Sequence, residues 1–308
     1  MAVYVNTNVS SLNGRRYLNN VQNQLTTTYQ RLSSGMRINS AKDDAAGLQI
    51  ADRLTTQING LNQGNRNTND GIALAQTIEG ALDETSSMLQ KIRTLAVQSA
   101  NGTNTADDRK AIDTEAKALQ DEITRIANQT KFGGKTLLVG TTKGAIYNTA
   151  AAGGAGGAGG ATGSKGKLTL QVGANNGDEI SFEVGNMRFS KIVSAANGQT
   201  ANIGFSDGKI VLGTASKAKA AIELMDKMIA VVDSQRSGLG AIQNRLESSI
   251  RNQSNVAANQ SDARSRIRDA DFAEESANLS QQSIIQQAAT SMLMQANSRP
   301  QLALSMLG

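Results

Sequence analysis

Two pairs of adjacent carboxylates are the residues of this chain best suited to acid–base or metal chemistry. Asp43 with Asp44, and Asp107 with Asp108, provide the paired acids that proton transfer or a hard cation could use. Both pairs stand where an apolar helical pattern begins. Acids at that position bond free backbone N–H groups and interact favourably with the helix dipole. We therefore predict that both pairs open helices, and we assign no catalytic residue.

The composition removes the side chains on which many enzymes depend. The 308-residue chain contains no His and no Cys. His is the side chain best suited to proton transfer near neutral pH, and zinc sites and Cys- or His-dependent triads need these two types. Carboxylate, Ser/Lys and Tyr chemistry stays open on composition alone. We predict that the protein is not an enzyme and that it holds no metal ion and no cofactor.

Two glycine motifs resemble nucleotide-binding loops but lack their context. Residues 154–159 fit the pattern G-x-G-x-x-G, which needs a preceding strand and a following helix. They lie inside the Ala/Gly tract 150–163, where such matches arise by chance. Gly134, Lys135 and Thr136 resemble the end of a phosphate-binding loop, but Gln129 stands where that loop needs its first glycine. Neither motif predicts a nucleotide site.

Charge and hydropathy argue against nucleic acid and membrane partners. The formal net charge is +5, acids and bases alternate, and aromatic residues make up 3% of the chain, so no basic stripe with stacking rings is present. No run approaches the roughly 18 apolar residues of a membrane helix, and the first eight residues lack a secretory signal pattern. The apolar tip at 302–307 predicts a protein contact and no membrane insertion. We expect a cytosolic protein, or one exported by a route that does not depend on a cleaved signal peptide.

Both ends of the chain carry helical stripes. The first stripe has steps of three and four residues and ends at Gly35: it comprises Leu18, Val21, Leu25, Tyr29 and Leu32. The last segment, about 271–293, has an apolar face, and we expect Pro300 to interrupt the helix beyond it. From this face we select as candidate seam residues Leu279, Ile284, Ala288 and Met292.

Long helices with a repeat of seven are predicted between these ends. The segment 45–100 would form a helix roughly 80 Å long at 1.5 Å per residue. Its repeat predicts a coiled-coil seam: Leu54, Leu61, Thr68, Ala75, Leu82, Leu89 and Ala96. A second helix opens near Asp107 and a third spans about 216–267. The seam of the third helix comprises Met225, Val232, Leu239 and Leu246. Lengths of this order predict a rod.

The middle of the chain has a different character. The alternating runs 168–172 and 180–184 flank Asn176 and Gly177, which predicts a β-hairpin. The tract 150–163 buries too little side chain to offset its ordering entropy, so we expect a loop there. The fold class is therefore mainly α: a long antiparallel coiled-coil or helix-bundle rod with paired terminal helices and a small central β-hairpin region.

The terminal helices predict assembly of many copies. A lone pair of helices buries one stripe per helix, which must offset roughly 1–2 kcal/mol of backbone entropy per residue. Stacking of copies would bury further faces. We therefore expect a homopolymer whose ends become ordered on assembly.

Several long motifs then resemble one family. Residues 32–48 (LSSGMRINSAKDDAAGL), 90–101 (QKIRTLAVQSAN), 239–245 (LGAIQNR) and 295–307 closely resemble the signatures of bacterial flagellins. The resemblance covers about 1–140, the hairpin and about 216–308. It implies a structural subunit of the flagellar filament. It also implies an extracellular location, with the export apparatus, a chaperone, the cap protein and hook-associated proteins as partners. A hook–filament junction protein shares the terminal pattern and is the alternative.

The resemblance also implies layers and contact residues. Residues 1–44 with 269–308 would form an inner coiled coil. Residues 45–185 with 216–268 would form a helical rod with the hairpin, and 186–215 a reduced variable outer region. The patch that Toll-like receptor 5 recognises in the family matches Lys91, Leu95 and Glu115. The usual residues of the family at these positions are Arg in place of Lys91 and Glu in place of Thr94. The resemblance therefore implies that the receptor recognises this chain more weakly. We add Arg245 as a candidate receptor or subunit contact.

Overall fold

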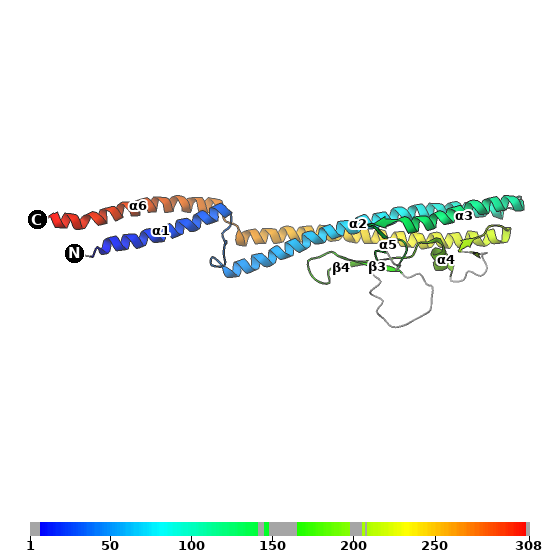
Figure 1. The fold of residues 1–308 in the computed structure, drawn as a ribbon, viewed down its shortest axis with the longest axis horizontal. Helices are drawn as coiled ribbons and strands as arrows, with labels where there is room; N and C mark the ends of the chain where they lie inside the picture. The colour runs from blue at the N-terminus through cyan, green and yellow to red at the C-terminus, as the bar shows by residue number, and fades with distance from the viewer. Residues whose placement is uncertain (1–6, 141–144, 148–164, 198–204, 207, 306–308) are drawn as a thin grey trace, which may run out of the picture. The chain divides into compact units, whose positions relative to one another are not determined.

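The fold is predominantly helical (Figure 1). A computed structural model describes residues 7–140, 145–147, 165–197, 205–206 and 208–305. Among these residues the helices are α1 (Val9–Ser34), α2 (Ala45–Ala100), α3 (Ala106–Gln129), α4 (Phe189–Asn197), α5 (Ala215–Arg268) and α6 (Phe272–Ser305). The predicted class, long helices with a small hairpin region, is confirmed.

Three two-stranded antiparallel sheets complete the described part of the chain. They pair β1 (Lys131–Phe132) with β2 (Lys135–Thr136), β3 (Gly166–Gln171) with β4 (Glu179–Val184), and β5 (Phe205–Ser206) with β6 (Lys209–Ile210). The middle pair is the predicted hairpin, in register with Leu170 opposite Ile180. Its turn contains Gly177 with φ 95°, a left-handed conformation that favours glycine.

The chain divides into two compact units. Residues 1–59 and 256–308 form one, the terminal unit, and residues 60–255 form the other, the central unit. The division into inner, rod and outer parts at 44, 185, 215 and 268 concerns an assembled state and stays a prediction. The Ala/Gly tract 150–163 lies outside the described residues.

In the terminal unit α1 and α6 lie side by side and run antiparallel (Figure 1). Asn8 reaches Ala296, Thr28 reaches Gln282 and Arg31 reaches Glu275 across the pair. Val21 and Leu25 are buried as the stripe predicts, but Tyr29 is 55% exposed and Thr28 is buried instead. The steps 18, 21, 25, 28 and 32 alternate between three and four residues, so the seam follows the heptad through Thr28.

Short backbone bonds tie the end of α1 to the start of α6. Gly35 ends α1 in a left-handed conformation with φ 69°, and its carbonyl accepts a hydrogen bond from the Ala270 N–H at 3.0 Å. The Arg37 N–H donates to the Arg268 carbonyl at 2.7 Å. Within the terminal unit, the end of α1 and the start of α6 are therefore held together by one hydrogen-bonded joint.

The expectation that Pro300 interrupts the last helix is wrong. Helix α6 continues through this position to Ser305. Proline breaks helices partly because it leaves the carbonyl four residues earlier without its N–H donor. Here that carbonyl, on Ala296, accepts a hydrogen bond from the Asn8 side chain at 2.7 Å. A partner from the other end of the chain thus replaces the lost helical bond.

The central unit has an apolar core built along the predicted seams. Helix α2 contributes Leu82 and Leu89, α3 contributes Ile123, and α5 contributes Met225 and Val232, all fully buried. Small and aliphatic side chains fill the space between long helices, as expected for a chain with few aromatic rings.

Helix α4 is an element that the sequence analysis does not predict. Phe189, Ile192 and Val193 of α4 are almost fully buried and join the core of the central unit, as do Ile210 and Leu212. Assignment of 186–215 to a variable outer region of an assembly stays a prediction. The apolar side chains of this segment nevertheless belong to the central core.

The hairpin packs closely on α2 at a row of glycines. A Cβ atom on Gly60 would lie 2.7 Å from the Cβ of Ala174, and one on Gly64 would lie 2.8 Å from the carbonyl carbon of Val172. The Asn67 amide donates to the Gln171 carbonyl at 3.0 Å, and the Gln253 amide of α5 donates to the Val172 carbonyl. Two helices therefore hold the end of β3 at contact distance.

Candidate functional surfaces

The second acid pair caps α3, as predicted. The Thr105 hydroxyl oxygen accepts a hydrogen bond from the Asp108 N–H, and the Asp108 carboxylate accepts one from the Thr105 N–H at 2.9 Å, which completes a capping box. Asp107 lies in the same first turn. Hydrogen bonds from the Thr105 hydroxyl and N–H lower the pKa of Asp108.

In the first acid pair, Asp44 caps a helix and Asp43 binds a loop. The Asp44 carboxylate accepts from the Gly47 N–H at 2.8 Å, and so caps α2 as predicted. The Asp43 carboxylate instead accepts from the N–H groups of Asn39 and Ser40 and from the Ser40 hydroxyl. These bonds, chiefly those from Ser40, lower the pKa of Asp43. Loop closure and capping thus occupy both carboxylates.

The lowered pKa values predict a loss of stability in acid. A carboxyl with a folded pKa below its unfolded value stabilises the protein above the unfolded pKa, and that contribution disappears as pH falls through the folded pKa. For Asp43 and Asp108 the window lies below the ordinary value of 3.8. We expect Asp108→Asn to flatten the fall in melting temperature between about pH 4 and pH 2.

The control for this experiment is Asp107→Asn, which removes a charge from the same turn and leaves the capping box intact. Melting curves by circular dichroism at stepped pH compare the two variants. Equal acid profiles for Asp108→Asn and Asp107→Asn would contradict the assignment of the effect to the capping box.

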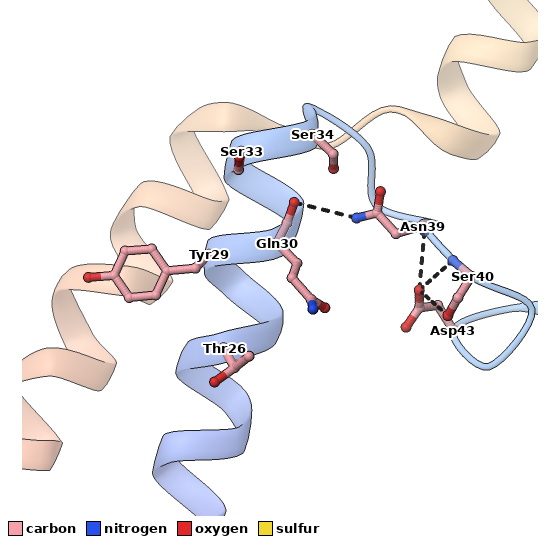
Figure 2. A pocket seen from close by; sticks show the side chains of 8 residues that line it. All are labelled: Thr26, Tyr29, Gln30, Ser33, Ser34, Asn39, Ser40 and Asp43. Carbon is pink, nitrogen blue, oxygen red and sulfur yellow. Dashed lines mark hydrogen bonds between the residues drawn. The ribbon is translucent and has the colours of Figure 1, made fainter.

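Two open grooves lie in the terminal unit, and most of the residues that line them have polar side chains. Figure 2 shows the first groove, beside which Tyr29 projects from α1. The Asn39 amide of the loop donates to the Gln30 carbonyl, and the Asp43 carboxylate accepts hydrogen bonds from the loop N–H groups. The second groove runs between α1 and α6 beside the Arg31–Glu275 ion pair of 3.1 Å. Among the described residues no group of three or more acids could hold a metal ion. In the first groove the Ser40 hydroxyl donates to the Asp43 carboxylate at 3.0 Å, and the same carboxylate also binds the loop N–H groups.

Two of the candidate receptor contacts meet on the surface of the central unit. Lys91 of α2 and Glu115 of α3 form an ion pair of 3.4 Å with side chains 60% and 51% exposed. Leu95 lies one turn from Lys91 on α2 but is only 7% exposed and belongs to the core. Lys91 and Glu115 are therefore accessible at the surface, whereas Leu95 is not.

Sequence reasoning missed an interhelix ion pair of Arg93, which lies two residues after Lys91 on α2 but bonds α5 instead of α3. The Arg93 guanidinium bonds both carboxylate oxygens of Asp226 on α5, at 2.6 and 3.3 Å. These hydrogen bonds raise the pKa of Arg93 and lower that of Asp226. Spacing on α2 alone suggests a solvated side chain at Arg93, because its partner is 133 residues away. Arg245, also on α5, is exposed.

The candidate seam residues divide into buried and exposed sets. On α1, Val21 and Leu25 are buried and Leu18 and Leu32 partly buried. On α6, Leu279 is partly buried, whereas Ala288 is exposed and Ile284 and Met292 are 66% and 71% exposed. Their roles between copies stay predictions.

Further large apolar side chains are exposed on the terminal helices. They are Val9, Leu12, Tyr17 and Tyr29 on α1 and Phe272 and Met294 on α6. None of the helices in the described part of the chain is long and apolar enough to cross a membrane. Two paired helices with this much uncovered apolar surface are suited to contact with protein.

Comparison with known proteins gives matches at both ends and over the whole length. A family model of the bacterial flagellin N-terminal helical region matches residues 5–143, and one of the C-terminal helical region matches residues 222–307. Flagellin A of Vibrio anguillarum is 38% identical, and polar flagellin C of Vibrio parahaemolyticus is 37% identical, each with 100% of both chains covered.

A solved structure of a candidate flagellar hook-associated protein from Vibrio parahaemolyticus matches with a TM-score of 0.54. Its sequence is 19% identical, and the match covers 74% of this chain and 100% of that one. At this identity the similarity concerns the fold alone.

Proposed function

The chain belongs to the bacterial flagellin family, and we propose that it is the structural subunit that polymerises into the flagellar filament, the helical propeller for swimming. The observation that carries this proposal is 38% identity to a flagellin over the full length of both chains. The role is mechanical, without a catalytic step. We place the protein outside the cell, in the filament.

The exposed apolar faces of α1 and α6 support polymerisation. Within one chain these helices bury a single seam, and side chains such as Tyr17, Ile284 and Met292 remain exposed. Burial of each such side chain against a neighbouring copy would contribute about 1.5–3 kcal/mol. A stack of copies supplies that burial repeatedly. The inner layer would then consist of residues 1–44 and 269–308.

The long seams suggest how a filament changes its shape. The seam positions of α2 include Thr68 and Ala75, which are small. Small side chains permit slight axial sliding between packed helices, and small shifts repeated along a filament add up to alternative supercoils. The family relationship further suggests the export apparatus, a chaperone, the cap protein and hook-associated proteins as partners.

A hook–filament junction protein is the second candidate function, because a hook-associated fold matches with a TM-score of 0.54. Seeded growth separates the two. We expect purified chain added to short filament seeds to grow long filaments, visible by electron microscopy. Growth that stops at short plugs would favour the junction role and contradict the filament role.

We propose that the Lys91–Glu115 surface is the part of this chain that Toll-like receptor 5 would contact. Both side chains are more than half exposed, so they are accessible on the unassembled chain. Leu95 is buried, so Leu95→Ala would lower the stability of the central unit by about 2–5 kcal/mol. A loss of signalling by that variant alone would not identify a contact.

Charge reversal at Glu115 tests the receptor proposal without disturbing the core. We expect Glu115→Lys to lower receptor activation by monomer about tenfold, since it replaces the ion pair by two like charges. Glu84→Lys, an exposed change elsewhere on the central unit, is the matched control. Reporter-cell signalling and melting temperatures are measured together. Equal potency of Glu115→Lys and the unchanged chain would remove this surface from consideration.

A further inference from the structure

The C-terminal part of α6 contains a carbonyl that its own helix cannot satisfy in the usual way. In an α-helix the carbonyl of residue 296 accepts the N–H of residue 300. Residue 300 is proline, which has no N–H, yet the helix continues to Ser305. An interior proline destabilises a helix by about 3 kcal/mol, partly because this bond is lost. Continuation of α6 therefore calls for a replacement donor at Ala296.

Asn8 supplies that donor from the opposite end of the chain. Its side-chain amide nitrogen donates to the Ala296 carbonyl at 2.7 Å, across a sequence separation of 288 residues. Its side-chain oxygen accepts from the Ser11 N–H at 3.1 Å and so caps the start of α1. One amide thus satisfies an orphan N–H of α1 and the orphan carbonyl of α6 at the same time.

We propose that Asn8 and Pro300 together form a register lock, which fixes the axial position of α1 against α6. Between this contact and the backbone hydrogen bond of Ala270 to Gly35, the contacts are apolar or are made by long side chains that can follow a small slide, such as Arg31 with Glu275 at 3.1 Å. In contrast, Asn8 has a short side chain and meets one carbonyl that proline singles out from its neighbours. A slide by one helical turn would break this hydrogen bond and leave the Ala296 carbonyl without its donor from α1.

The chemistry of the lock depends on an amide at residue 8. Ser and Asp cap helices about as well as Asn. Ser has a shorter side chain, and an ionised Asp has no proton to donate. Either substitution therefore keeps the cap on α1 and removes the donor to Ala296. Pro300→Ala restores an N–H at position 300, which can donate to the Ala296 carbonyl within the helix. In that variant the carbonyl no longer requires the Asn8 amide as its donor.

A cysteine pair can report the register directly, because the natural chain has no Cys. A Cβ atom on Gly14 would lie 3.9 Å from the Cβ of Leu293. This distance falls within the roughly 3.5–4.5 Å range of disulfides. The reporter is therefore the full-length chain with Gly14→Cys and Leu293→Cys. A second reporter, Gly14→Cys with Ala289→Cys, is displaced by one turn of α6, about 5.4 Å.

The test measures the initial rate of intramolecular disulfide formation in dilute full-length chain. We expect rapid closure of the in-register pair, and a rate about three- to tenfold lower when Asn8→Ser or Asn8→Asp is added, as suits the loss of one hydrogen bond. In the Pro300→Ala background the same changes at Asn8 should alter the rate less than about twofold. The displaced pair should gain closure as the in-register pair loses it.

Three outcomes would overturn the lock. They are no closure of the in-register pair in the chain with Asn8 and Pro300, equal closure with and without the Asn8 amide, and an Asn8 effect that persists undiminished with Pro300→Ala. Thermal melting of each full-length variant, followed by far-ultraviolet circular dichroism, confirms that its central unit is folded. The assay needs no filament, so its result is independent of the proposed polymerisation.

Discussion

Gly64→Ala should destabilise the central unit by about 2–4 kcal/mol, although alanine is the better helix former by about 1 kcal/mol. The added Cβ would overlap the carbonyl of Val172 in the hairpin. That carbonyl is also the acceptor for Gln253, and the neighbouring Gln171 carbonyl accepts from Asn67. Displacement of the hairpin would therefore cost overpacking strain of about 1–3 kcal/mol and weaken two hydrogen bonds worth about 1 kcal/mol each.

Helix α2 offers a matched control in Gly80. A Cβ atom there would meet nothing within 4 Å. We expect Gly80→Ala to stabilise the chain by about 0.5–1 kcal/mol, since only the helix propensity changes. Urea unfolding of the full chain, followed by circular dichroism, measures both. If both variants shifted the midpoint of urea unfolding in the same direction, the proposed effect of the contact between the hairpin and α2 on stability would be contradicted.

Removal of residues 270–308 should abolish seeded filament growth. The deletion takes away α6, and with it the partner of Val21 and Leu25 and the Arg31–Glu275 ion pair. Helix α1 alone buries no seam, and an isolated helix of this kind is marginal in water. Light scattering and electron microscopy after addition of seeds provide the measurement.

The control for this truncation is deletion of residues 151–163 from the Ala/Gly tract. We expect that variant to polymerise, because it leaves both terminal helices intact. The melting curve of the central unit should be unchanged in both deletions, which separates assembly from folding. Normal filaments from the chain that lacks 270–308 would refute a polymerisation role for the paired ends.

Much of the local structure was predictable because it depends on residues a few positions apart. The start of α3 follows from Thr105 and Asp108, three residues apart, and the hairpin from Asn176 and Gly177 between alternating runs. The buried row of α5 follows from a repeat of seven that includes Met225. The family, too, is carried by contiguous motifs such as residues 32–48.

The candidate surfaces were predictable only in part. Lys91 and Glu115 meet, but the burial of Leu95 beneath them depends on the packing of α2 against the core. The ion pair between Arg93 and Asp226 joins two helices whose relation no short-range pattern reveals. The same holds for α4, whose side chains Phe189, Ile192 and Val193 join a core made by residues far away in the sequence.

The sequence by itself determined the starts of the long helices, their caps, the hairpin and the family, because neighbours within about one heptad set backbone preference and amphipathic period. The tertiary structure alone decided that Thr28 takes the seam position, that glycines of α2 admit the hairpin, and that α6 continues through Pro300. Each of these depends on atoms from a distant part of the chain. From the sequence, a proline at this position predicts a helix break. In the structure, Asn8, which is 288 residues from Ala296, supplies the missing hydrogen-bond donor.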